Sequence, residues 1–117
     1  MRRSFAHEAV LVMPADADIR APGAAVTVAL CGQPDHSPPC PLAAHHTRAD
    51  RVGDEVRLRI LFATEDEELV RRRIERTLSA GRFAGPDGVV TEWRFITGGR
   101  SEVTAEEAAH AERLTRS

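Results

Sequence analysis

The sequence predicts an α+β fold, a mostly antiparallel sheet of four to five strands with two helices in a two-layer sandwich. Segments in which apolar and polar residues alternate with a period of two, typical of strands, are interspersed with segments of helical periodicity. A chain of 117 residues also has the length of one domain. We therefore expect residues 1–117 to fold around a single core.

The N-terminal half predicts strands. Residues 5–13 have the apolar content of a strand that ends at Pro14, and residues 16–23 resemble a turn or loop. Residues 24–31 alternate with a period of two, which predicts a second strand with two buried faces. Residues 45–51 form an extended arm that turns at 52–54, and 56–62 is the clearest strand of the chain.

The C-terminal half predicts both helices. Thr64 and Glu67 have the spacing of a capping box for a helix that closes at Gly81. Residues 85–88 predict a turn, and residues 89–97 predict a strand that the glycines at 98–99 end. A second capping box, Thr104 with Glu107, opens a short closing helix with a thin apolar stripe. A ferredoxin-like arrangement is an alternative, although this order of elements does not match its repeat cleanly.

The chemistry of the chain is concentrated in a proline-rich loop at residues 31–46, which holds four of the seven prolines. Both cysteines and three of the five histidines lie here, with the spacing C-x4-H-x3-C-x4-H-H. Thiolate and imidazole groups are the ligands of tetrahedral Zn²⁺, and Cu or Ni sites fit them less well. The sequence therefore predicts a zinc site with these candidate ligands: Cys31, His36, Cys40, His45 and His46.

Which four of the five ligands bind one ion stays open. Cys31, His36 and Cys40 are the first choices, with His45 or His46 as the fourth, because neighbours in an extended arm point to opposite faces. Asp35 could orient His36. Three other interpretations compete with metal binding: a disulfide between the cysteines, a buried Cys31 that acts as a small apolar residue, and unpartnered surface histidines.

Composition excludes several classes of function. A hydrophobic content of 42% and a charged content of 29% are those of a globular protein, and no apolar stretch approaches the roughly 20 residues of a membrane span. The opening Arg2-Arg3 resembles an export signal, but the apolar residues 9–13 are too few for one. We therefore expect a cytoplasmic protein that has no membrane partner. The net charge of −2 makes nucleic acid an unlikely partner.

No motif identifies catalytic residues, which stay unknown. Nucleophile elbows, nucleotide-binding fingerprints and H-E-x-x-H helices are all missing from the sequence. The leading hypothesis is a small protein whose zinc holds the loop in shape for an unknown protein partner. The alternatives are a small metal-dependent hydrolase with an open coordination position, and a metal carrier or sensor. The sequence does not predict an oligomeric state.

Overall fold

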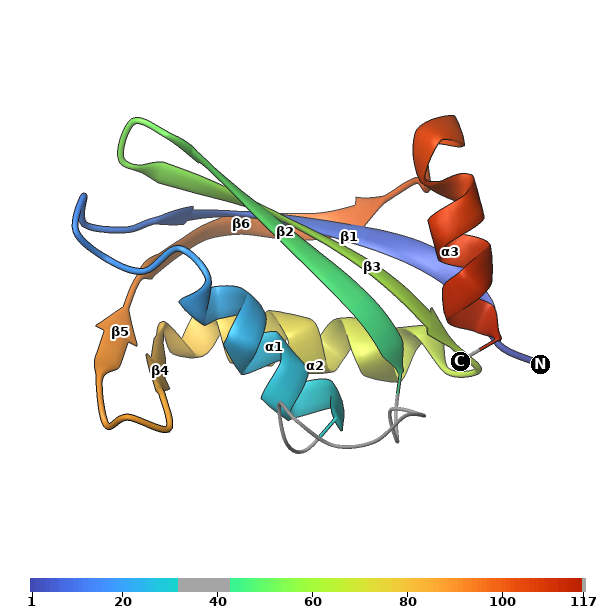
Figure 1. Cartoon of the computed structure of the whole chain (residues 1–117), viewed down its shortest axis with the longest axis horizontal. Helices are drawn as coiled ribbons and strands as arrows, with labels where there is room; N and C mark the ends of the chain where they lie inside the picture. Colours follow the sequence, from blue (N-terminus) through green and yellow to red (C-terminus); the bar gives the residue numbers. More distant parts are fainter. Residues whose placement is uncertain (32–42, 117) are drawn as a thin grey trace.

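The computed structural model describes residues 1–31 and 43–116, and confirms an α+β fold (Figure 1). Its elements in chain order are β1 (Arg3–Val12), α1 (Ala21–Cys31), β2 (Ala44–Val52), β3 (Glu55–Thr64), α2 (Glu67–Ala80), β4 (Arg82–Ala84), β5 (Val90–Glu92), β6 (Arg94–Ser101), a 3₁₀ turn η1 (Ala105–Glu107) and α3 (Ala108–Thr115). None of the helices in these ranges combines the length and apolar character that a bilayer crossing requires.

Four strands form one antiparallel sheet in the order β2-β3-β1-β6. Helix α1 connects β1 to β2 across β3, and α2 with the β4–β5 hairpin connects β3 to β6 across β1. This is the split βαβ arrangement of a ferredoxin-like fold. The sequence analysis does not predict this arrangement, because it assigns most residues of α1 to a strand.

The prediction of a strand at residues 24–31 is wrong: these residues belong to α1. Apolar residues occur on both apparent faces of the segment, so its period of two does not distinguish a buried strand from a buried helix. Four alanines favour the helix, and Pro22 near its start occupies a position that needs no backbone donor. Gly23 lets α1 approach the sheet closely, because a Cβ there would lie 2.7 Å from Thr47 Oγ1.

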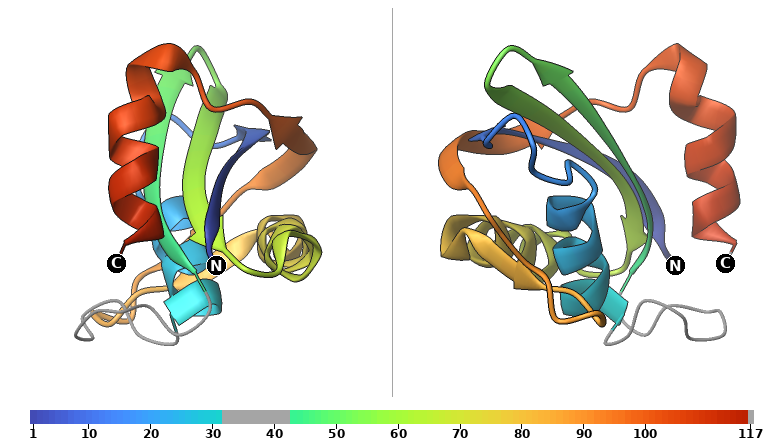
Figure 2. Two further views of the ribbon diagram at one scale, coloured as in Figure 1. Left: turned by 90° about the vertical axis from the view of Figure 1, so that its right-hand side faces the viewer. Right: turned by 60° about the vertical axis from the view of Figure 1, so that its left-hand side comes forward.

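The sheet has two unlike faces because side chains alternate along each strand. One face packs against α1 and α2, and the views in Figures 1 and 2 place α3 on the opposite face. The first face carries the core of the fold. Its largest fully buried residues from the strands and α2 include Leu11, Leu58, Ile60, Phe62, Ile74 and Leu78.

The ends of α2 test two predictions from the sequence. The predicted Thr64–Glu67 capping box is wrong: Asp66 is the N-cap and accepts from the Leu69 backbone, whereas Thr64 Oγ1 accepts from the backbone of Asp66 itself. The predicted closure at Gly81 is confirmed, since this residue has a left-handed φ of 73°. The helix therefore starts two residues later than predicted and ends where expected.

The region after α2 differs from the single strand predicted at 89–97. The turn at 85–88 is confirmed within the β4–β5 hairpin, and Trp93 separates β5 from β6. Trp93 is buried and its indole nitrogen donates to the Leu78 carbonyl oxygen at 2.8 Å.

Gly98 and Gly99 do not end the strand, because β6 pairs with β1 as far as Ser101. The capping box at Thr104 and Glu107 is confirmed, and opens η1 before α3.

Substitution of Gly81 by alanine is expected to destabilise the protein by about 2 kcal/mol or more. A left-handed φ costs a residue with a Cβ roughly 1–2 kcal/mol, and this Cβ would also lie 2.7 Å from the Trp93 carbonyl oxygen. Gly53→Ala is the matched control, since Gly53 has a φ of 65° with no atom within 4 Å of the added carbon. Urea unfolding should give the larger loss at Gly81, and equal losses would show that the contact with Trp93 costs nothing.

Candidate functional site

Two of the predicted ligands lie side by side on the helix-covered face of the sheet. Cys31 is the last residue of α1 and His45 is the second residue of β2, and Cys31 Sγ lies 3.5 Å from His45 Nδ1. The Ala43 carbonyl oxygen is also near, at 3.8 Å from the sulfur and 3.2 Å from Nδ1. Cys31 is buried and the imidazole is half-buried. The pair is therefore a partly enclosed sulfur and nitrogen environment.

Thr27 holds the other side of the His45 ring. Its Oγ1 lies 2.9 Å from His45 Nε2 and 3.1 Å from the Gly23 carbonyl oxygen, one turn earlier in α1. The ring has two arrangements of its proton. With the proton on Nε2, the ring donates to Thr27 Oγ1 and the Nδ1 lone pair faces Cys31; with the proton on Nδ1, the ring donates to the Ala43 carbonyl oxygen and Nε2 accepts from Thr27. Helix α1 therefore supplies both a possible ligand and a group that orients the imidazole.

The oxidation state of Cys31 matters for its chemistry. Its sulfur is disulfide-bonded in the structure, and no described cysteine is free. This observation favours the disulfide interpretation for the oxidised chain. A thiolate, the form that binds a metal ion, is available only after reduction. Metal binding and disulfide formation at Cys31 are thus mutually exclusive states of one sulfur.

His46 lies on the opposite face of the sheet from His45. There it meets His110 of α3, with the two ring centroids 4.7 Å apart and the planes inclined by 55°. Partial burial, followed by the charges of His110 and Arg48, lowers the pKa of His46. The structure therefore separates the two neighbouring histidines, and His46 does not face Cys31.

The remaining predicted ligands, His36 and Cys40, lie outside the described residues, as does Asp35. Within residues 1–31 and 43–116, no three groups of the Cys, His, Asp and Glu types gather closely enough to hold a metal ion. Of the three predicted ligands that the structure describes, Cys31 and His45 lie together, whereas His46 lies on the opposite face of the sheet.

Helix α3 is held against the sheet by Arg59 of β3. Arg59 donates to both carboxylate oxygens of Glu107, at 2.7 and 2.6 Å, and also to Glu8, Ser101 and the Glu102 carbonyl. The hydrogen bonds from Arg59 are the main reason that the pKa of Glu107 falls to about 2. The Thr104 backbone and hydroxyl bind the same carboxylate. This cluster positions His110 above His46.

A buried ionisable group lies on the face of the sheet that packs against α2. His7 of β1 is 2% exposed, and its Nδ1 accepts from the Arg71 guanidinium at 2.9 Å. Its Nε2 lies 3.2 Å from Glu75 Oε1 without the alignment of a good hydrogen bond. Burial, and after it the charge of Arg71, lowers the pKa of His7. A regular hydrophobic pattern around His7 was the only sequence signal, and it does not reveal these partners.

Arg71 is the buried cation of this network. It donates to Glu67 at 2.8 Å and to the Ala6 carbonyl at 2.9 Å, and its guanidinium lies over the rings of Phe5 and Phe62. Although Arg71 belongs to a run of three arginines in α2, it is only 7% exposed. Its hydrogen bonds and aromatic contacts compensate for the loss of water.

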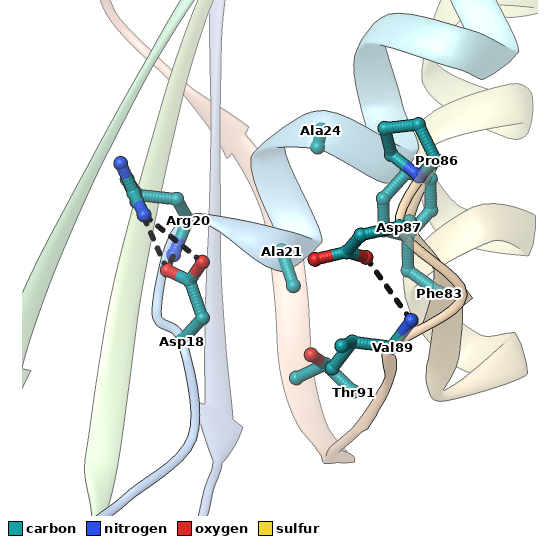
Figure 3. Close-up of a pocket in the computed structure, with 10 residues that line it drawn as sticks. Asp18, Arg20, Ala21, Ala24, Phe83, Pro86, Asp87, Val89 and Thr91 are labelled. Carbon is teal, nitrogen blue, oxygen red and sulfur yellow. Dashed lines mark hydrogen bonds and ion pairs between the residues drawn. The ribbon is translucent and has the colours of Figure 1, made fainter.

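Two further cavities have mixed polar and apolar linings, and several of their charged groups are paired within the protein. One, of about 320 Å³, lies between the start of α1 and the β4–β5 hairpin (Figure 3). There Asp18 binds Arg20, and Asp87 accepts from the Val89 backbone. The other, of about 560 Å³, is lined by Arg71 and Arg100, which both bind Glu67. Neither lining points to a particular ligand.

Comparison with known proteins adds no family to these observations. No family model and no curated protein matches the chain. The candidate site therefore has to be judged from its own geometry.

The free energy of unfolding should fall as the pH is lowered from about 7 to 5. The pKa of His7 is below its ordinary value of 6.5 in the folded state. The unfolded chain consequently takes up a proton near pH 6.5 that the folded chain does not, which favours unfolding in acid. His7→Gln should flatten this slope in urea titrations at several pH values. His46→Gln is run in parallel because the lowered pKa of His46 acts in the same direction; a slope unchanged by His7→Gln would contradict the assignment.

Glu107→Gln should destabilise the protein by about 1–3 kcal/mol at pH 7, because an amide cannot replace the charged partner of Arg59. The Glu107 carboxylate contributes fully above its ordinary pKa of 4.5, and this contribution is lost as the pH falls toward 2. Glu106→Gln is the matched control at the neighbouring, exposed position. Thermal unfolding at pH 7 and near pH 2 checks the prediction. Equal effects of the two substitutions at pH 7 would show that the ion pair adds nothing to the stability of the protein.

Proposed function

We propose that this protein binds one transition-metal ion, with Zn²⁺ as the physiological ion, in its reduced state. The proposed ligands are Cys31, His36, Cys40 and His45, a Cys₂His₂ set suited to tetrahedral zinc. The ion would fix the proline-rich segment 31–46 for contact with a protein partner. A reducing compartment such as the cytoplasm would keep the cysteines available.

The observation that carries this proposal is the 3.5 Å approach of Cys31 Sγ to His45 Nδ1. Two ligands of one tetrahedral zinc lie about 3–4 Å apart, given Zn–S and Zn–N bonds of about 2.3 and 2.1 Å. The two residues come from α1 and β2 and flank the segment that carries His36 and Cys40. Because two of the four ligands already have a suitable spacing, metal binding has to order fewer side chains, and its entropic cost is lower.

Thr27 supports the proposal from behind the ring. Metal-bound histidines usually donate their second ring N–H to an oxygen, which fixes the tautomer. Thr27 Oγ1, 2.9 Å from His45 Nε2, is placed to accept that proton. Cys31 and His45 are both at least half-buried, which fits an ion with a structural role better than the open position of a hydrolase or the exposed site of a carrier.

Oxidation of Cys31 would release the ion, because a disulfide sulfur has no thiolate to offer. The test therefore begins with protein reduced and stripped of metal. Native mass spectrometry after Zn²⁺ addition, in the presence of a competing chelator, should show one tightly held ion per chain. Removal of this ion should lower stability by several kcal/mol, on the scale of a structural zinc site.

Neighbouring substitutions provide a matched pair. His45→Gln and Cys31→Ser should lose the tightly held ion, whereas His46→Gln should retain it because His46 lies on the other face of the sheet. Thr27→Val should weaken binding by about tenfold, as expected for loss of an orienting group. Retention of the ion by both His45→Gln and Cys31→Ser, or its absence from the reduced wild-type protein, would refute the proposal.

A further inference from the structure

On the sheet face opposite α1 and α2, His46 and His110 bring two metal-ligating imidazoles into contact. The residues are 64 positions apart in the chain and come from β2 and α3. Neither ring makes a hydrogen bond to any residue within the described ranges 1–31 and 43–116. Their nitrogen lone pairs are therefore not committed to the fold.

We propose that His46 and His110 form a second, independent site for a divalent transition-metal ion, linking β2 to α3. Zn–N bonds of about 2.1 Å at a tetrahedral angle place two imidazole centroids about 5 Å apart. The observed centroid distance of 4.7 Å is close to this value, and small rotations of the two side chains would make up the difference. The rings are inclined by 55° rather than stacked flat, which leaves room for their edges to turn toward one ion.

The surroundings supply a possible third ligand. A cavity of about 140 Å³ beside the pair is lined by Glu106 and Glu107 of η1, which precedes α3. Glu107 is committed to Arg59, but Glu106 makes no ion pair with a described residue. Within residues 1–31 and 43–116 no three such groups already gather around one point, so Glu106 would join the two imidazoles only after its exposed side chain rotates toward them.

Arg48 opposes cation binding at this site. It lines the same cavity, and its guanidinium forms an ion pair at 3.5 Å with the exposed carboxylate of Asp50 on the same strand. Arg59 also lines the cavity, but it is paired with Glu107 and Glu8. We therefore expect weaker, reversible binding here than at a four-ligand site, and removal of the Arg48 charge should strengthen it.

The test uses the full chain with Cys31→Ser, which removes one of the four ligands proposed for the first site and leaves the effect of His110→Ala to report on the second. Isothermal titration of this metal-free protein with Zn²⁺ near pH 7.5 should show one ion per chain. Adding His110→Ala should lower the affinity at least about tenfold, since one of two imidazole ligands is lost. Adding Arg48→Gln should raise the affinity several-fold, and Glu106→Gln should lower it.

Glu112→Gln is the control substitution on α3, because Glu112 is exposed and does not line this cavity. It should leave the affinity unchanged. Zn²⁺ should also raise the unfolding temperature of the Cys31→Ser protein but not of its His110→Ala derivative, because the ion connects α3 to the sheet. The proposal fails if the Cys31→Ser protein binds no Zn²⁺, or binds it equally well with and without His110. Either result leaves the proposal for Cys31 and His45 untouched.

Discussion

The strict alternation of side chains along an antiparallel strand is the constraint on which this structure depends. It gives the sheet one apolar face, buried by α1 and α2, and one polar face, where Arg59 anchors α3 through Glu107. It also divides adjacent residues between unlike environments. His45 turns toward the sulfur of Cys31, while His46 turns toward α3. Two histidines that look like one motif in the sequence therefore belong to different chemical settings.

The sequence predicted those parts of the fold where local patterning and packing agree. The hairpin of β2 and β3 has one polar and one apolar face, and Gly81 and Thr104 have side chains suited to helix ends. Residues 24–31 were misread because they are apolar on every side, so periodicity could not choose between helix and strand. The ferredoxin-like order of strands became recognisable only with that segment as a helix, since the crossover from β1 to β2 depends on it.

The candidate site was predictable in part. Spacing drew attention to Cys31 and His45, and the structure brings these two together, but spacing carries no information about the redox state of a sulfur. His7 and His110 were not among the predicted site residues, because their partners are distant in the sequence. Arg71 lies 64 residues from His7, and His46 lies 64 residues from His110. Such long-range pairs arise from the register of the sheet and from helix docking, which no local pattern encodes.

The absence of a side chain at Gly23 has a consequence for the distant end of α1. The backbone of this helix can press against Thr47 only because no Cβ stands between them. That approach sets the separation of α1 from β2, and with it the distance between the sulfur and the imidazole two turns further along. A methyl group at this position would force α1 away from Thr47 and so alter the distance between Cys31 Sγ and His45 Nδ1. The spacing of Cys31 and His45 thus depends on the lack of a side chain at Gly23.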